Sequence, residues 1–161
     1  MKVRKFALVL SALCILFCGC GVSDKTVTVD KLSVTLPANY ADYSNESLSA
    51  NYTFTYGYQD IAGMGLKEDF SLFREYGLDP TLEEYLDLVI STNGITQPAA
   101  EDNDLYTFSF SSDVDGVMYS YLAAVYEGSD AFWLVQAGCQ SQNYQKNLEQ
   151  FRQILHSVTV S

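Results

Sequence analysis

The chain has 161 residues, the size of one typical domain, and a formal charge of −11 from 20 acidic and nine basic residues. So acidic a surface repels phosphate backbones, which excludes nucleic-acid binding.

The N-terminus has the layout of a secretion signal. Three basic residues precede an apolar run over 6–17, which is too short to span a bilayer but matches a signal-peptide core. The run leads into Gly19 and Cys20, and lipoprotein processing requires a small residue directly before a cysteine. We therefore expect residues 1–19 to be removed and the Cys20 thiol to carry a diacylglycerol.

The segment Leu16-Phe17-Cys18-Gly19-Cys20 resembles a bacterial lipobox, with Phe17 at the position that leucine usually takes. The resemblance implies a protein held by lipid at the extracytoplasmic face of the cell membrane, since two acyl chains on one residue give stable anchoring. Two alternatives remain open at this point: a plain secretory signal cut nearby, and an uncleaved membrane anchor.

Processing would leave a short tether, residues 20–26, and one domain over 27–161. Three of the nine basic residues and none of the acids lie in 1–19, so the processed chain has a formal charge of −14. Cys139 and His156 are then its single free cysteine and its single histidine. We expect no disulfide and no zinc or copper site of the ordinary kinds. Cys139 follows an apolar alternation and is expected to be buried.

Alternating apolar and β-branched residues predict strands in the first half of the domain. The predicted strands cover Thr26–Val29, Leu32–Leu36, Ser49–Tyr58 and Ile61–Asp69. Residues 38–48 are predicted to form a polar loop, and Phe70–Tyr76 a short helical turn.

The first full helix is predicted over Pro80–Thr92, where Thr81 and Glu84 match a capping box. Three strands are predicted next, over 105–111, 117–126 and 131–139, with a hairpin turn at Asp115-Gly116. The last two are apolar on both faces, which requires cover on both faces of the sheet. A helix over Gln142–His156 with one apolar stripe, and a short strand within 157–161, complete the domain.

This order of elements resembles the Mog1/PsbP-like fold and the small bacterial lipoproteins that share it. The resemblance is carried by Leu32–Pro37, Thr81–Leu86, the three-strand meander and the closing segment Gln150–Val158, and it spans roughly residues 27–160. It implies an α+β fold, a mostly antiparallel sheet with helices packed on both faces as an α/β/α sandwich. Members of this fold group serve mainly as accessory or partner-binding proteins, so the resemblance implies no reaction and no site residues.

No catalytic or cofactor motif is present in the sequence. His156 falls at the C-terminal end of the last predicted helix, where a histidine interacts favourably with the helix dipole. Glu83, Glu84 and Asp87 are interpreted as a solvated helix face. The segments 113–116 and 101–104 are interpreted as acidic turns rather than calcium loops. We therefore assign no catalytic residue, metal ligand or cofactor.

Tyrosine is the unusual feature of the composition, with 12 residues. Strand alternation accounts for Tyr52, Tyr56 and Tyr58. Tyr40 and Tyr43 fall in the predicted loop, and because tyrosine is enriched at interfaces they are the candidate binding surface.

Three functions are compatible with these patterns. The first is a non-catalytic accessory lipoprotein that binds another protein of the cell envelope. The second is a lipoprotein that binds a small molecule or glycan in a tyrosine-lined pocket. The third, ranked last, is a hydrolase that uses paired carboxylates.

Overall fold

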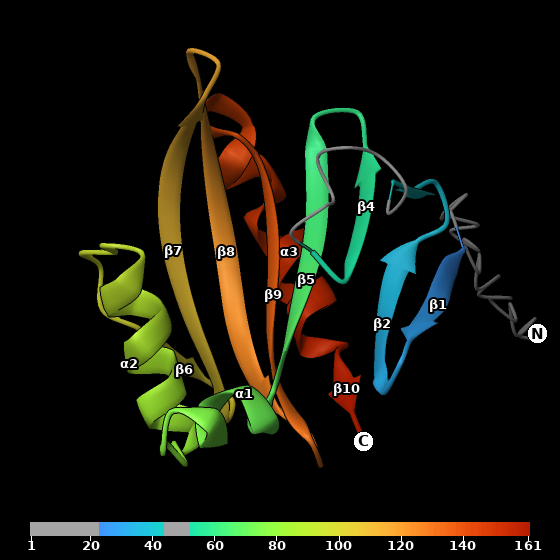
Figure 1. Ribbon diagram of the computed structural model, residues 1–161. Helices are drawn as coiled ribbons and strands as arrows, with labels where there is room; N and C mark the ends of the chain where they lie inside the picture. The colour runs from blue at the N-terminus through green and yellow to red at the C-terminus, as the bar shows by residue number, and fades with distance from the viewer. Residues whose placement is uncertain (1–22, 44–51) are drawn as a thin grey trace, which may run out of the picture.

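A computed structural model describes residues 23–43 and 52–161 (Figure 1). The signal region with Gly19 and Cys20, and part of the loop predicted over 38–48, lie outside the described residues. Within the described part, a seven-stranded antiparallel sheet has the order β3-β4-β5-β9-β8-β7-β6, and a three-stranded sheet has the order β1-β2-β10. The large sheet comprises β3 (Ala41–Asp42), β4 (Phe54–Tyr58), β5 (Ile61–Asp69), β6 (Ala100–Asp102), β7 (Leu105–Val114), β8 (Val117–Glu127) and β9 (Ala131–Gln140). The small one comprises β1 (Asp24–Val29), β2 (Leu32–Pro37) and β10 (Thr159–Val160).

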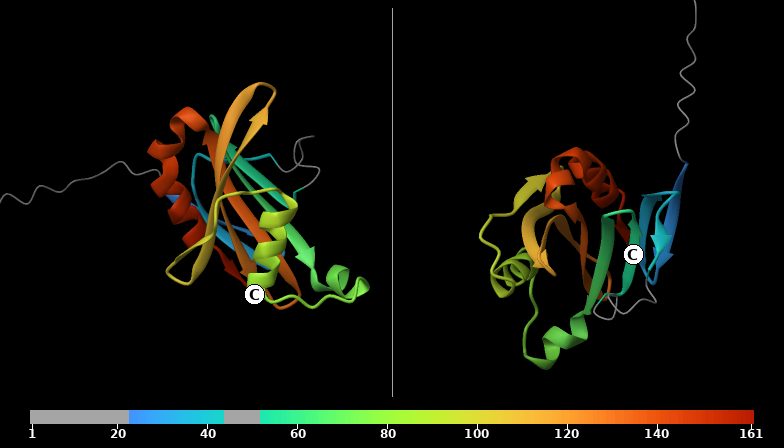
Figure 2. Two further views of the ribbon diagram at one scale, coloured as in Figure 1. Left: turned by 90° about the vertical axis from the view of Figure 1, so that its left-hand side faces the viewer. Right: turned by 90° about the horizontal axis from the view of Figure 1, so that it is seen from above.

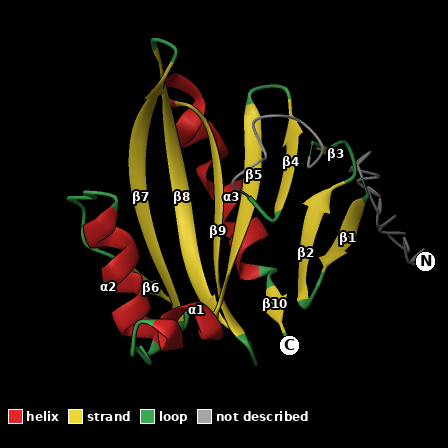
Figure 3. Ribbon diagram, viewed as in Figure 1, coloured by secondary structure: helices red, strands yellow, loops and turns green. Residues whose placement is uncertain are grey.

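The helices lie on both faces of the large sheet, as predicted. In Figures 2 and 3, α2 (Leu82–Thr92) lies on one face and α3 (Tyr144–His156) on the other. The short helix α1 (Phe70–Glu75) lies at one end of the sheet, on the α2 side. No described helix is long and apolar enough to cross a membrane.

Strands β8 and β9 form the centre of the core because both their faces are covered. Along β8, Ala123 and Val125 pack toward α2, while Leu122 and Ala124 pack toward α3. Cys139, at the α3 side of β9, is fully buried, as the sequence predicted.

The two longer helices begin and pack as the sequence pattern indicates. At the start of α2 the Thr81 hydroxyl accepts a hydrogen bond from the Glu84 amide at 3.3 Å, and the Glu84 carboxylate accepts one from the Thr81 amide at 2.8 Å. This confirms the capping box. On α3 the predicted stripe holds, with Phe151 and Leu155 fully buried.

The small sheet packs on the same face as α3 but does not join the large sheet. Leu32, Val34 and Leu36 of β2 are buried in the core that α3 shares. The Ser157 hydroxyl, just after α3, accepts a hydrogen bond from the Thr35 amide at 3.0 Å. Strand β2 pairs with β1 along its full length on one edge and with β10 at Leu32 and Ser33 on the other.

A cluster of charges connects the small sheet to one end of the large one. Lys67 on β5 lies 2.6 Å from Asp30 in the β1–β2 turn, 3.1 Å from Asp69 and 3.6 Å from Asp130 in the β8–β9 turn. Lys31 lies 2.8 Å from Asp130. The hydrogen bond to Asp30, assisted by the other two carboxylates against desolvation, raises the pKa of Lys67.

Two short strands, β3 and β6, were not predicted, and β7 extends three residues beyond its predicted end. The acidic segment over 101–104 is a tight hairpin turn in which Asn103 and Asp104 have φ values of 50° and 63°. The turn at Asp115-Gly116 has φ values of 54° and 82°. Both are two-residue turns of the type that matches strand twist, and they let pairing continue up to the turn.

A glycine at the centre of the sheet makes room for an aromatic ring. A Cβ atom at Gly138 would lie 2.3 Å from the Tyr121 ring and 2.7 Å from the Ser120 carbonyl oxygen, whereas a Cβ at Gly63 would meet nothing closer than 3.8 Å. We expect Gly138→Ala to lower the free energy of unfolding by about 1–3 kcal/mol through overpacking. The matched variant Gly63→Ala should leave it within about 0.5 kcal/mol. Urea denaturation of both variants checks this, and equal effects would contradict the packing described.

Candidate functional site

Helix α2 covers just part of the sheet face on which it lies. It packs over Phe108, Val125 and Phe132, and in Figure 1 it flanks one end of β7 and β8, leaving the other end of this face without a described helix. Four rings from β7 and β8 form a continuous aromatic row that begins under α2 and runs onto the open part: Phe108, which is buried, then Phe110, Tyr121 and Tyr119. Neighbouring ring centroids lie 6.2, 4.9 and 6.5 Å apart in that order.

The strand register explains why these rings meet. Phe110 pairs directly with Tyr121 across β7 and β8, so both side chains lie on the same face of the sheet. Their rings are nearly parallel, at 15°. Tyr121 in turn pairs with Gly138 of β9, and its ring lies over that glycine. Phe110, Tyr121 and Tyr119 all remain partly exposed.

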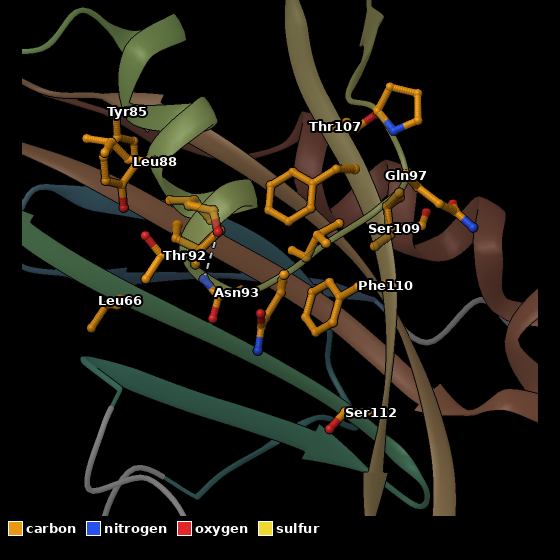
Figure 4. A pocket seen from close by; sticks show the side chains of 18 of the residues that line it. Leu66, Tyr85, Leu88, Thr92, Asn93, Gln97, Thr107, Ser109, Phe110 and Ser112 are labelled. Carbon is orange, nitrogen blue, oxygen red and sulfur yellow. Dashed lines mark hydrogen bonds between the residues drawn. The ribbon is translucent and has the colours of Figure 1, made fainter.

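A cavity of about 1630 Å³ opens beside this row and continues around strand β7. Figure 4 shows Leu88 and Thr92 of α2 and the following residue Asn93 on one side of it, with Leu66 of β5 and Phe110 of β7 facing the same space. We call this part the aromatic groove. Its floor also includes Leu134 and Gln136 of β9. On the other side of β7, next to α3, the cavity is lined by Ser109, Ser111, Tyr144, Gln145 and Leu148, which we call the rear lobe.

A few polar groups lie among the apolar ones in the aromatic groove. The buried Gln136 side chain donates to the Tyr52 hydroxyl at 3.4 Å. The Tyr85 hydroxyl donates to the Glu68 carboxylate at 2.5 Å. Burial, followed by this hydrogen bond, raises the pKa of Tyr85 above its ordinary range. The groove can therefore bury apolar surface and offer hydrogen bonds at its margins.

The prediction that Tyr40 lies on an exposed surface is wrong. Its side chain is 2% exposed and belongs to the main core, next to Tyr58 at a ring distance of 6.4 Å. Burial, and secondarily the nearby Cys139, raises the pKa of Tyr40 to about 12. The composition of 38–48 predicted an exposed polar loop. In the structure the Tyr40 side chain instead packs into the core directly before the chain enters β3.

Tyr43 is 39% exposed, and a Cβ atom at Gly57 would lie 2.8 Å from its ring. Gly57, Ala62, Gly138 and Tyr121 pair in sequence across β4, β5, β9 and β8, so Tyr43 lies on the same sheet face as the aromatic row, near the opposite edge. The structure thus separates the two residues that the sequence grouped.

The acidic residues considered as chemical groups have structural contacts. Glu83 accepts a hydrogen bond from the Tyr106 hydroxyl at 2.7 Å, and Glu84 belongs to the capping box. Asp113 accepts one from the Gly116 amide at 2.9 Å and so stabilises the hairpin turn. In the described part of the chain, no group of three or more potential metal ligands comes together.

Cys139 and His156 also occupy structural positions. Burial, as the largest cause, raises the pKa of the Cys139 thiol, which accepts a hydrogen bond from Asn147 at 3.6 Å. A thiol held protonated in this way is a poor nucleophile. His156 is the exposed last residue of α3.

Sequence reasoning missed the aromatic row, although a signal for it exists. Phe108 and Phe110 alternate on one strand, and Tyr119 and Tyr121 alternate on the next. Counting outward from a two-residue turn at Asp115-Gly116 places Phe110 opposite Tyr121. The composition of the loops drew attention to Tyr40 and Tyr43 instead.

Comparison with solved structures shows that the chain has the Mog1/PsbP-like fold. It is similar to cyanobacterial PsbP (CyanoP) from Synechocystis sp. PCC 6803, with a TM-score of 0.52, 13% identity, and coverage of 90% of this chain and 96% of that one. It is also similar to the Ran-binding protein Mog1p of Saccharomyces cerevisiae, with a TM-score of 0.51, 8% identity, and coverage of 86% and 96%.

A third similar structure comes from Bacteroides thetaiotaomicron VPI-5482, with a TM-score of 0.53 and 7% identity. This chain is covered to 88% but spans about half of that one, 49%. No family model and no curated protein sequence matches the chain. At these identities the comparisons establish the fold alone.

The Tyr85–Glu68 contact gives a prediction for stability. We expect Tyr85→Phe to lower the free energy of unfolding by about 1–3 kcal/mol at pH 7, because a buried hydrogen bond to a carboxylate is lost. Since the pKa of Tyr85 is raised on folding, its stabilising effect is full below about pH 10 and is lost as the pH rises further. The difference between wild type and Tyr85→Phe should therefore be constant up to about pH 9 and shrink as the pH rises through about 10 to 11 in urea titrations.

Tyr76→Phe serves as the control, because Tyr76 is 82% exposed. A gap between wild type and Tyr85→Phe that stays constant across this pH range would contradict the raised pKa.

Proposed function

We propose that the chain is a non-catalytic lipoprotein, anchored by lipid on Cys20 at the extracytoplasmic face of the cell membrane, that binds another protein of the cell envelope through the aromatic groove. The observation that carries the proposal is the aromatic row. Four stacked rings lie on a sheet face that the described helices leave partly uncovered, and three of them remain partly exposed. Exposed apolar patches of this kind mark interaction sites.

The shape of the groove favours a macromolecular partner. Pockets for small molecules usually enclose roughly 300–1,000 Å³ and bury most of their ligand. The cavity here has a volume of about 1630 Å³ and extends over both faces of a strand. The structural neighbours are compatible with this proposal, since one of them is described as a Ran-binding protein.

The position of the tether supports a free groove. Figures 1 and 2 place β1 and β7 on opposite sides of the molecule. The described chain enters β1 at Asp24, four residues after Cys20. The anchor would therefore hold the small sheet near the membrane and leave β7 and the aromatic groove accessible to a partner.

A glycan is the second candidate, favoured by the stacked rings and by the amide of Gln136 in the floor. Aromatic faces beside a few hydrogen-bonding groups suit a sugar ring. A screen of the protein's melting temperature in the presence of sugars tests this alternative. Binding of a sugar in the groove should raise the melting temperature of the wild type, and Phe110→Ala should abolish that rise.

The anchoring part of the proposal is tested by metabolic labelling with palmitate in the native host. We expect labelled protein in the membrane fraction for the wild type. Cys20→Ala should lose both the label and the membrane association, because no processed lipoprotein can form, while Cys18→Ala should retain both. Undiminished labelling of Cys20→Ala would show that Cys20 is not the modified residue.

The binding part is tested by crosslinking in intact cells, with captured proteins identified by mass spectrometry. We expect one envelope protein to be recovered with the wild type and its yield to fall at least tenfold for Phe110→Ala, because the centre of the aromatic row is removed. Tyr58→Ala is the control, since Tyr58 is also an aromatic residue with exposed surface but lies outside the cavity. Equal recovery with both variants would contradict the assignment of the groove.

A further inference from the structure

The outer edge of β7 is unpaired along more than half of the strand. Strand β6 pairs with residues 105–107 of β7, and no described strand pairs with this edge beyond Thr107. In a two-residue hairpin the residues that flank the turn exchange both backbone hydrogen bonds. Leu105 therefore points its N–H and C=O groups toward β6, and Val114 points its own toward β8. Counting along the strand from either end, the backbone groups of Ser109, Ser111 and Asp113 point outward.

This edge lacks the features with which proteins usually protect an edge strand. Such protection comes from charged residues, proline, bulges or very short strands. The segment 105–112 contains no charged residue and no proline, and its pairing with β8 is continuous. At the other edge of the same sheet, β3 has two residues and one of them is Asp42. Between the end of β6 and Asp113 the unpaired edge is therefore uncharged over 108–112, and such a stretch is a ready template for another strand.

The cavity lies on both sides of this same edge. Its lining includes the consecutive residues 107–112, with Phe108 and Phe110 facing the aromatic groove, and Ser109 and Ser111 facing the rear lobe. A strand added about 4.8 Å from β7 would send successive side chains alternately into these two spaces. An extended segment of five residues, roughly 17 Å long, is enough to pair with 109–113.

We propose that the partner contributes an extended peptide segment that adds to the outer edge of β7, forming backbone hydrogen bonds with Ser109, Ser111 and Asp113. This inference rests on the proposed function and specifies how the partner binds. The segment has apolar side chains that contact Phe110 and the aromatic groove, alternating with small or polar ones in the rear lobe. It carries basic residues at its ends, because Glu101 lies at one end of the edge and Asp113 and Asp115 at the other.

Charge and position distinguish this occupant from two others. A second copy of the chain would bring a further formal charge of −11, or −14 after processing, to an edge already flanked by acids. Such like-charge pairing opposes association. The tether of the same chain leads into β1, which lies on the opposite side of the molecule from β7. With three residues between Cys20 and Asp24, the tether is too short to reach the edge.

The test uses a phage-displayed library of random peptides selected on the full-length processed protein in detergent micelles. We expect enriched peptides with alternating apolar residues and flanking Lys or Arg. Ser111→Pro should weaken their binding by at least about tenfold, because it removes an outward N–H and places a ring at the edge. Thr26→Pro is the matched control on the edge strand β1. Its N–H also points outward by the same count from the β1–β2 turn, so binding should be unchanged.

A second measurement leaves the protein unaltered, in case Ser111→Pro fails to fold. N-methylation of alternate amides along one edge of a selected peptide should abolish binding, whereas methylation of the other set should preserve it. The proposal is overturned if no peptide is enriched, if both methylated forms bind equally, or if the folded Ser111→Pro protein binds as the wild type does.

Selection of peptides that match the 105–114 sequence, together with self-association of the protein, would identify a second copy as the occupant and overturn the proposal. If envelope-protein capture depends on Phe110 but not on Ser111, the proposed function stands and strand addition is wrong.

Discussion

The burial of β9 on both faces is the constraint on which the rest of the structure depends. Phe132 on one side requires α1 and α2, and Trp133 on the other requires α3 and the small sheet. Helix α2 has 11 residues, or about 16 Å of length, whereas the 11 residues of β8 extend about 36 Å. One helix therefore covers about half of the face. Phe110, Tyr121 and Tyr119 of the aromatic row lie beyond the covered part, where their rings shield the sheet without a second helix. The groove follows from this mismatch in length.

The parts of the fold that depend on local pattern could be predicted from the sequence. The Thr81–Glu84 capping box, the Asp115-Gly116 hairpin and the α3 stripe each have a signal within a few residues, and each is confirmed. The separation into two sheets has no local signal, since it depends on β10 returning to pair with β2 across more than 120 residues of chain. The prediction that Tyr40 is a surface residue was wrong for the same reason. Residues distant in the sequence, such as Tyr58 and Cys139, decide its burial.

The aromatic groove and the outer edge of β7 form one continuous site. Phe110 has its side chain on the groove floor, while the backbone groups of its neighbours Ser109 and Ser111 face outward at the edge. A partner strand would thus gain backbone hydrogen bonds and apolar burial together, which is how edge addition combines affinity with specificity. An open edge that is uncharged over 108–112 is also a hazard for aggregation. The strongly acidic surface opposes self-pairing while leaving a basic partner free to bind.

Hydrogen exchange of the protein, compared free and in complex with the captured envelope partner, tests this account most directly. The account predicts new protection confined to the amides of Ser109, Ser111 and Asp113 and to the neighbouring end of α2, with β1 and β2 unchanged. Protection centred on the small sheet, or on the loop side near Tyr43 with β7 unaffected, would contradict it.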